Sequence, residues 1–91
     1  MTQEPEKIEE QQLVGEVTHY FGNIGVAVIQ VLDVLRVGDT IRIVGGVDTD
    51  FEQLIDSMEV EHEKVQEAKK GDDIGLKVDQ KVREGYKVYK L

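Results

Sequence analysis

The sequence contains no cysteine and no tryptophan, one proline, and only two phenylalanines and three tyrosines among its 91 residues. The absence of cysteine excludes disulfide bonds, thiolate zinc ligands and thiol nucleophiles, and it is typical of a protein that folds in a reducing compartment. The few aromatic residues are too scattered to form a platform on which nucleic-acid bases stack. We therefore expect the aromatic side chains to pack in the core or in hairpins.

Long apolar runs and an excess of basic residues are also absent. No run approaches the roughly 20 apolar residues of a membrane-spanning helix, and residues 1–12 lack a secretory apolar core. These features predict a cytoplasmic protein without a membrane partner. Eleven basic against nineteen acidic residues give a net charge of −8, which repels a phosphate backbone and disfavours nucleic acid as a main partner.

The distribution of charge predicts the domain boundaries. A chain of 91 residues provides one small domain. Residues 1–12 carry four glutamates and almost no apolar side chain, which predicts a flexible acidic tail before a single domain over residues 13–91. Residues 48–63 hold seven acidic and no basic residues, whereas residues 64–91 hold eight basic and five acidic ones. The fold must therefore accommodate an acidic segment followed by a basic one.

The spacing of apolar residues is typical of strands. Residues 14–20, 40–44 and 73–79 alternate between apolar and polar side chains, as in a strand with one buried face. Residues 25–32 are almost all apolar and predict a short strand that is covered on both faces. Gly22, Asn23 and Gly25 predict a turn that joins residues 14–20 to residues 25–32 in a hairpin.

One apolar segment within the acidic stretch can be interpreted in two ways. The parity of its apolar residues changes between Ile55 and Met58, so a continuous strand needs a β-bulge at Asp56 or Ser57 for both sets to face the core. The same residues also fit the i, i+3, i+4, i+7 pattern of a helix over residues 51–63, which is the alternative.

A short local pattern recurs three times, with a cation two residues before a glycine and a β-branched residue three after it. The three copies are Arg36–Gly38–Ile41, Lys69–Gly71–Ile74 and Arg83–Gly85–Val88. Glycine tolerates the positive φ that a tight turn requires, so each copy predicts a turn into a new strand. Six to seven short strands joined by such turns protect their edges best in a closed or nearly closed antiparallel β-barrel, so the fold class is all-β.

Catalytic and cofactor motifs are absent from the sequence. No phosphate-binding GxxxxGK[ST] loop is present, and the single serine, Ser57, stands in no nucleophile motif. The acidic run that begins at Asp48 fails as a calcium loop, because the required glycine position is occupied by Gln53. We therefore predict a protein that is not an enzyme and holds neither a cofactor nor a metal.

His62 lies between Glu61 and Glu63 and invites a metal or acid/base role. In a strand, however, the two glutamates point to the face opposite His62, so the three side chains do not converge. Glu59 and Glu61 do share a face, and two carboxylates one pleat apart can bind a cation or orient a ligand hydroxyl.

Four blocks of sequence resemble, in order, the second domain of translational GTPases, the small β-barrel that follows the G domain in elongation factor Tu and elongation factor one-alpha. The blocks are VGEV at residues 14–17, LRVGDTIRI at 35–43, SMEVEHEKVQEAKKGDDIGLKV at 57–78 and VREGYKVYKL at 82–91. The resemblance covers residues 13–91 and implies a β-barrel. Similar barrels stand as appended C-terminal domains in collagenase-like peptidases linked to RNA modification, and residues 25–45 fit that group too.

The resemblance to elongation factors also implies roles for individual residues. Glu59 matches the glutamate against which the family holds the terminal adenosine of aminoacyl-tRNA. The positions that match structural turns of the family are Gly38, Asp39, Gly71, Asp72 and Gly75, and Gly85 completes the predicted turns.

These observations lead to one functional hypothesis and one alternative. The hypothesis is a monomeric, non-catalytic, translation-factor-like module that docks a protein or ribonucleoprotein of the translation apparatus, with RNA disfavoured by the net charge. Its expected binding residues are Glu59, Glu61, His62, Lys64, Lys69, Lys70 and Arg83. The alternative is an acidic protein that binds a metal or a small ligand through residues 48–63, using Asp48, Asp50, Glu59 and Glu61.

Overall fold

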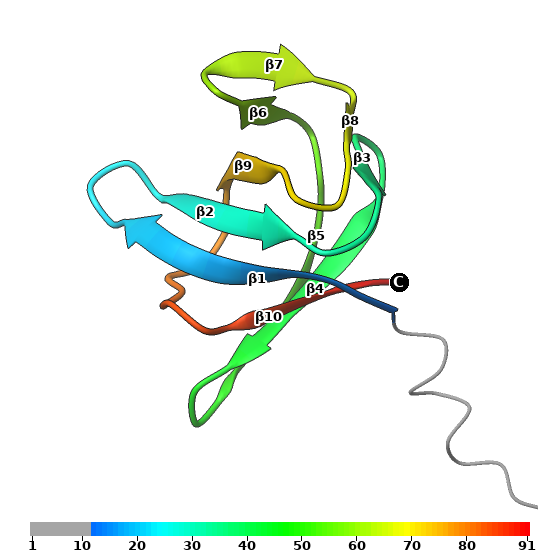
Figure 1. The fold of residues 1–91 in the computed structure, drawn as a ribbon. Coiled ribbons are helices and arrows are strands. Elements are labelled where there is room, and N and C mark those ends of the chain that lie inside the picture. The colour runs from blue at the N-terminus through cyan, green and yellow to red at the C-terminus, as the bar shows by residue number, and fades with distance from the viewer. Residues whose placement is uncertain (1–11) are drawn as a thin grey trace, which may run out of the picture.

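A computed structural model describes residues 12–91, so the predicted tail over residues 1–12 lies outside the described residues except for Gln12. Within this part the chain forms ten strands: β1 (Gln12–Phe21), β2 (Val26–Val31), β3 (Leu35–Arg36), β4 (Thr40–Gly45), β5 (Thr49–Leu54), β6 (Met58–Val60), β7 (Glu63–Val65), β8 (Glu67–Ala68), β9 (Asp73–Lys77) and β10 (Lys87–Lys90). Figure 1 shows their arrangement. No helix in residues 12–91 is long and apolar enough to cross a membrane.

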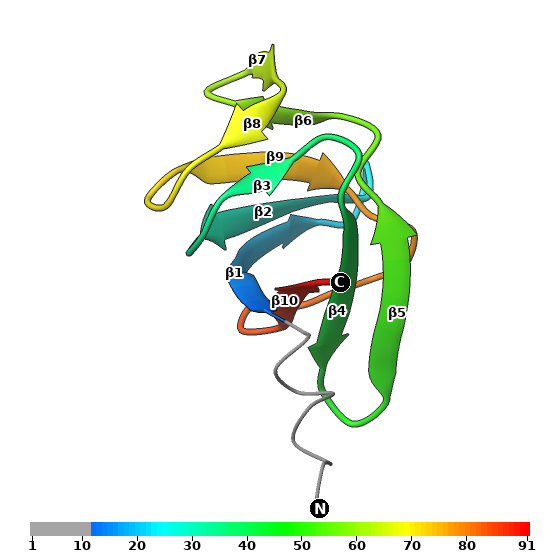
Figure 2. The same ribbon diagram turned by 90° about the vertical axis from the view of Figure 1, so that its right-hand side faces the viewer.

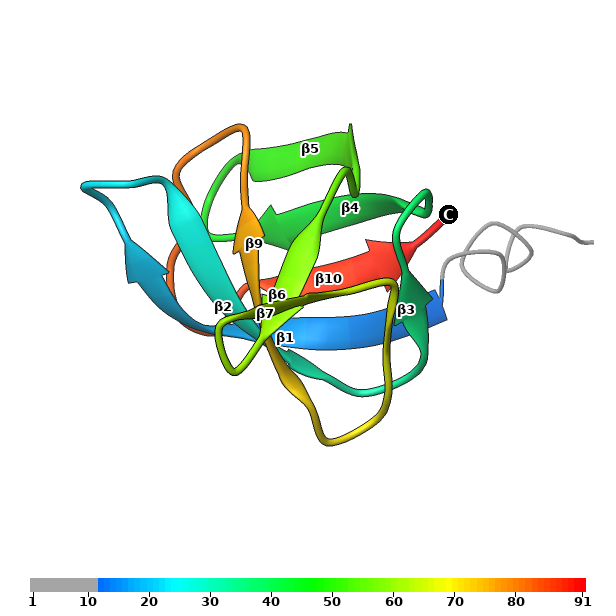
Figure 3. The same ribbon diagram turned by 90° about the horizontal axis from the view of Figure 1, so that it is seen from above.

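Antiparallel pairing of these strands confirms the all-β prediction. Eight strands form one sheet in the order β5-β4-β10-β1-β2-β9-β6-β7, and β3 pairs separately with β8. The strand count therefore exceeds the predicted six to seven. The large sheet bends strongly, so that β4 and β5 run crosswise to β2 and β9 (Figures 2 and 3). Strand pairing does not close it, because β5 and β7 stand at opposite ends of the order in the described part of the chain.

The acidic segment is neither a helix nor a single bulged strand. It forms β5, then three residues without regular structure, then β6 and β7. Ile55, which follows β5 directly, is buried on the same side as Phe51 and Gln53 of that strand. Met58, the first residue of β6, is buried as well. The change of parity therefore marks a crossing from one end of the sheet to the other, and both the helix and the β-bulge predictions are wrong.

The core lies between the two crossed parts of the sheet. Inward residues alternate with outward ones along β2, β4, β5 and β9, as the period-2 pattern of a half-buried strand requires. In β1 the pairing shifts between Leu13 and Gly15 and again between Val17 and His19, so Val14 and Val17 are both buried although their positions differ in parity. The fully buried side chains from the four longest inward series include Val14 and Val17 of β1, Ile29 and Val31 of β2, Ile41 and Ile43 of β4, and Ile74 of β9. These branched side chains fill the interior with little loss of rotamer freedom.

The three recurrent glycine patterns form the predicted turns. Gly38, Gly71 and Gly85 have φ of 101°, 98° and 94°. In each turn the backbone NH of the residue after the glycine donates to the backbone carbonyl of the lysine or arginine three positions earlier. The N–O distances are 3.0 Å for Asp39 to Arg36, 2.9 Å for Asp72 to Lys69 and 3.2 Å for Tyr86 to Arg83. Asp39 and Asp72 also accept, through their carboxylates, the backbone amides of Arg36 and Lys69 at 2.9 Å each. These turns agree with type II geometry, which places glycine at the third position.

The glycine pair Gly45–Gly46 has a packing role that the sequence does not reveal. A Cβ at Gly45 would overlap the ring of Tyr86, and one at Gly46 would lie 2.6 Å from the tyrosine hydroxyl oxygen. The two glycines at the end of β4 therefore make room for an aromatic ring that comes from the segment before β10.

A buried polar side chain, that of Gln53, links β5 to the end of β9, two strands that do not pair with each other through their backbones. Gln53 of β5 is 9% exposed, and its amide nitrogen donates to the carbonyl of Lys77 at 3.0 Å. Its amide oxygen accepts the backbone NH of Asp79 at 2.9 Å. The side chain thereby reproduces the donor and acceptor of a backbone peptide group and links β5 to the end of β9.

Candidate functional site

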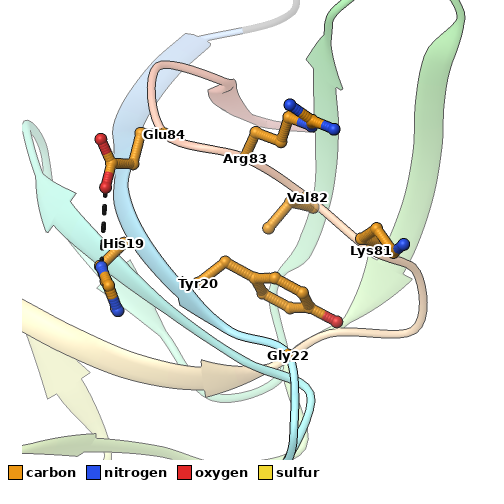
Figure 4. A pocket seen from close by; sticks show the side chains of 7 residues that line it. All are labelled: His19, Tyr20, Gly22, Lys81, Val82, Arg83 and Glu84. Carbon is orange, nitrogen blue, oxygen red and sulfur yellow. Dashed lines mark ion pairs between the residues drawn. The ribbon is translucent and has the colours of Figure 1, made fainter.

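Two surface hollows flank the hairpin formed by β1 and β2. The first has a volume of about 570 Å³ and lies where the end of β1 faces the segment that leads into β10 (Figure 4). Its lining residues are His19, Tyr20, Gly22, Lys81, Val82, Arg83 and Glu84. His19 Nδ1 lies 3.6 Å from Glu84 Oε2, and the two side chains are 50% and 71% exposed.

The lining of the first hollow is poorly suited to binding a ligand. Figure 4 shows His19 and Glu84 on one side of it and Lys81 and Arg83 on the other, with the Tyr20 ring and Val82 between them. Val82 is buried, but all four charged or titratable side chains are exposed. Its two large apolar side chains, Tyr20 and Val82, are half-buried and buried, so a ligand would cover little apolar surface here. The second hollow differs in exposing large apolar side chains, Phe21 and Ile24, and is the better candidate for a site.

The second hollow has a volume of about 580 Å³ and lies on the outer face of the large sheet. Its lining residues are Phe21, Ile24, Val26, Val28, Glu59, Glu61, His62, Asp73, Ile74 and Gly75. One row of directly paired residues crosses four strands here, namely His19 of β1, Val28 of β2, Gly75 of β9 and Glu59 of β6. The hollow is therefore built by the register of strands that are distant in sequence.

One wall and the floor of the second hollow are apolar. Phe21 is 47% and Ile24 is 60% exposed, although both are large hydrophobic residues. The Phe21 ring packs edge-on against His19, with ring centroids 4.4 Å apart. Such an edge-to-face contact fixes the orientation of a partly exposed ring. Val26 and Val28 are half-buried on the same face, so residues 25–32 are covered on one face only and the prediction of two covered faces is wrong.

The opposite wall is acidic and comes from the β6–β7 hairpin. Glu61 and His62 form its turn with φ of 52° and 69°, in the left-handed region that non-glycine residues seldom adopt. Two consecutive left-handed residues are the geometry of a type I′ turn, which matches the twist of a hairpin. Glu59 lies on β6 just before the turn, and Asp73 begins β9. The expected strand faces of Glu61 and His62 are thus replaced by a turn that brings both side chains to the hollow.

The structure unites only some of the predicted binding residues. Glu59, Glu61 and His62 line the second hollow together, whereas Arg83 lines the first. Lys69 and Lys70 lie at the turn before β9. The backbone of this turn is hydrogen-bonded to Val31 at the end of β2. These two lysines and Lys64 line neither hollow. The expected continuous basic surface beside Glu59 is therefore not formed by this set.

Gly75 is the least expected member of the second hollow. The resemblance to elongation factors assigns it to a turn, but it lies in the middle of β9. A Cβ added there would meet only Val26 Cγ1, at 3.8 Å, and its φ is not positive. A glycine inside a strand costs about 0.5–1 kcal/mol relative to alanine. Since neither the backbone nor the packing requires it, Gly75 keeps the floor of the hollow open at a cost in stability.

The acidic residues of the alternative hypothesis are not gathered into one site. Asp50 on β5 pairs with Arg42 on β4, with Nε–Oδ1 and Nη2–Oδ2 distances of 2.8 and 2.6 Å. Glu59 lies on β6, toward the other end of the sheet order. Residues 12–91 contain no group of three or more histidine, aspartate or glutamate side chains able to hold a metal ion. The four carboxylates of the alternative hypothesis therefore do not form one site, because β5 and β6 lie apart in the sheet, although Glu59 and Glu61 line the same hollow.

The Arg42–Asp50 pair makes stability depend on pH. The hydrogen bonds from Arg42 lower the pKa of the Asp50 carboxyl. A carboxyl with a lowered pKa stabilises the fold above its unfolded pKa of about 3.9, and this contribution is lost as the pH falls through the lowered pKa. In an NMR titration, we expect Arg42→Gln to move the Asp50 midpoint upward. Arg36→Gln, which breaks only the pair with Glu67, is the control. An unchanged Asp50 midpoint in Arg42→Gln would contradict the assignment.

Comparison with known proteins supports a relation to peptidases. No protein-family model matches the chain. It is 38% identical over 78 residues to an uncharacterized protease of Methanocaldococcus jannaschii, and the match covers 86% of this chain. The chain spans only 19% of the length of that relative.

Two crystal structures share the fold. Both are of the C-terminal domain of a protein described as a U32 peptidase, from Geobacillus thermoleovorans. One matches with a TM-score of 0.82 at 22% identity, covering 88% of this chain and 92% of that domain. The other, a selenomethionine variant, matches with a TM-score of 0.80 at 22% identity, covering 85% and 96%.

These matches correct the predicted family and function. The relative is named as a protease and the structures are of a peptidase C-terminal domain, so the resemblance to the second domain of elongation factor Tu is wrong, as is the translation-factor-like module inferred from it. The blocks that suggested it contain the three type II turns and the strands that follow them. Turn chemistry of this kind specifies a backbone path and not a ligand, and folds host unrelated functions. The other resemblance, to C-terminal domains of peptidases, agrees with these matches.

Proposed function

We propose that the chain is a non-catalytic domain of the kind that stands at the C-terminus of U32 peptidases, and that it binds an unfolded polypeptide for a catalytic module located elsewhere. The observation that carries this proposal is the extent of the match to the M. jannaschii protease. It covers nearly all of this chain but only a small part of the relative, which leaves most of that protein for the catalytic machinery.

The surface of the domain supports polypeptide binding. Large apolar side chains that remain exposed next to one another often mark interaction sites, and Phe21 and Ile24 occupy one hairpin in this way. Aromatic residues are enriched in protein interfaces. The net charge of −8 favours a basic polypeptide over an acidic one or a nucleic acid.

We also propose that the bent sheet functions as a nearly closed barrel. The Gln53 side chain supplies the link between β5 and the end of β9 that backbone pairing omits. A stiff sheet of this kind keeps the hollow on its outer face in shape without a ligand, which lowers the entropic cost of binding.

The test uses fluorescently labelled lysozyme that has been reduced and alkylated, which is an unfolded basic polypeptide. We expect the purified chain to bind it in a fluorescence anisotropy titration without cleaving it over several hours on a gel. Alkylated casein, an unfolded acidic polypeptide, is the matched probe and should bind at least 10-fold more weakly because of charge repulsion.

A domain swap extends this test to the relative. Deleting the matched segment from the M. jannaschii protease should abolish its binding to unfolded lysozyme, and inserting this chain in its place should restore binding. Cleavage by this chain alone would contradict a non-catalytic role. Failure of the isolated chain to bind either polypeptide would refute the binding role.

A further inference from the structure

The second hollow, on the outer face of β1, β2, β9 and β6, has a glycine at its floor where the fold leaves room for a side chain. Gly75 lies at its centre, paired with Val28 on one side and with Glu59 on the other. A side chain at this position would have room, since the nearest atom to its Cβ is Val26 Cγ1 at 3.8 Å. A glycine inside a strand often marks a place where a ligand or another backbone approaches closely.

The apolar side of the hollow is suited to an aliphatic side chain of a ligand and not to a charged one. Phe21, Ile24 and Val26 come from the β1–β2 hairpin, and none of them is fully buried. The Phe21 ring, which lines the hollow, is oriented by its edge-to-face contact with His19. An aliphatic side chain seated over Gly75 would cover this exposed apolar surface, which supplies the main driving force for binding.

The other side of the hollow carries negative charge. Glu59, Glu61 and Asp73 line it, and no lysine or arginine does. None of these three carboxylates takes part in an ion pair among the described residues, although Lys64 lies across from Glu59 on β7. Carboxylates around an apolar centre attract basic residues and repel phosphate, so the charge selects a basic peptide over a nucleic acid.

We propose that this hollow, hereafter the Gly75 hollow, binds a short basic peptide segment, with one leucine-sized apolar side chain over Gly75 and flanking lysine or arginine residues facing Glu59, Glu61 and Asp73. The inference rests on the proposed function and names the part of an unfolded polypeptide that the domain recognises. The site combines an apolar anchor with charge complementarity, two features that together provide both affinity and specificity.

The test uses a labelled nine-residue peptide with a central leucine flanked by lysine and arginine, together with the same peptide carrying glutamate in place of the basic residues. The wild-type chain should bind the basic peptide at least 10-fold more tightly than the acidic one. Amide shifts in NMR spectra should concentrate in residues 59–62 and 73–75, and not in residues 81–84 of the first hollow.

Single-residue variants distinguish binding at the Gly75 hollow from attraction by the net charge of the protein. Gly75→Val should weaken binding of the basic peptide at least 10-fold while leaving the melting temperature unchanged or higher. If valine disturbs β9, Gly75→Ala is the smaller change that still narrows the floor of the hollow, because its added Cβ makes only an ordinary contact. Glu59→Gln should weaken binding three- to 10-fold and reduce its salt dependence. Gly22→Ala, in the first hollow, is the matched glycine control and should bind normally.

The outcomes distinguish this inference from the proposed function. If the chain binds unfolded lysozyme but Gly75→Val and Glu59→Gln bind it as well as wild type, the Gly75 hollow is not the site while the binding role stands. Equal affinity for the basic and acidic peptides would overturn the charge selection. If unfolded lysozyme is not bound at all, the proposed function fails, and the peptide site fails with it.

Discussion

Replacement of Gly15 by valine is expected to lower the free energy of unfolding by about 3 kcal/mol, the upper end of the usual cost of overpacking a core. Gly15 is buried in β1 and pairs with Val31 on one side and Val88 on the other. A Cβ at this position would lie 2.6 Å from Ile29 Cγ2 and 3.1 Å from the carbonyl oxygen of Gln30. Because one obstacle is backbone and the other a stiff, fully buried side chain, neither can move away at low cost.

Thermal or urea denaturation measures this effect. For a domain of this size 1 kcal/mol corresponds to about 4–8 °C, so the melting temperature should fall by roughly 12–24 °C. The matched control is Gly22→Ala, where the added Cβ meets only Tyr20 Cε2 at 3.6 Å and φ is not positive. That control should be neutral or slightly stabilising. Equal stability of the Gly15 variant and the control would show that β1 and β2 lie farther apart than in this structure.

Replacement of Gln53 by leucine should lower the free energy of unfolding by about 1–3 kcal/mol, the cost of leaving a partly buried donor or acceptor without its partner. The leucine fills the same space but offers nothing to the Lys77 carbonyl or the Asp79 amide, which Gln53 now binds at 3.0 and 2.9 Å. The amide of Asp79 should also exchange its hydrogen faster than in wild type.

Gln30→Leu is the control for Gln53→Leu, because Gln30 is exposed on β2 and its replacement should change stability by no more than about 0.5 kcal/mol. Urea denaturation of both variants, with hydrogen exchange of Asp79, gives the comparison. If the two leucine variants are equally stable, the link between β5 and β9 contributes nothing and the proposal of a nearly closed barrel loses its support.

Local features of the fold could be predicted because their causes are local. The strands over residues 14–20, 40–44 and 73–79 follow from alternation of apolar side chains. The turns at Gly38, Gly71 and Gly85 follow from the tolerance of glycine for positive φ, and all three glycines adopt it. The same locality explains the mistaken family: strands and turns are shared by many β-folds, whereas the ligand is set by side chains that meet across the sheet.

The candidate site was only half visible in the sequence. Glu59, Glu61 and His62 are close together in the chain and were expected to contribute to binding. Phe21 and Ile24 were missed, and the signal that could have found them is a pair of large apolar residues beside a turn, next to an apolar strand with more hydrophobic residues than one buried face requires. Their meeting with Glu59 depends on the register of β2, β9 and β6.

By itself, the sequence determined an all-β domain of acidic character, the turns at Gly38, Gly71 and Gly85, and the inward faces of β4 and β9, because these depend on neighbours within a few positions. Only the tertiary structure decided that Gly75 opens a hollow between an apolar and an acidic wall, that Gln53 replaces a missing strand contact, and that Gly45 and Gly46 make room for Tyr86. The physical reason is that such contacts join segments far apart in the chain. A shift of one residue in strand register would turn each of these side chains to the opposite face of the sheet.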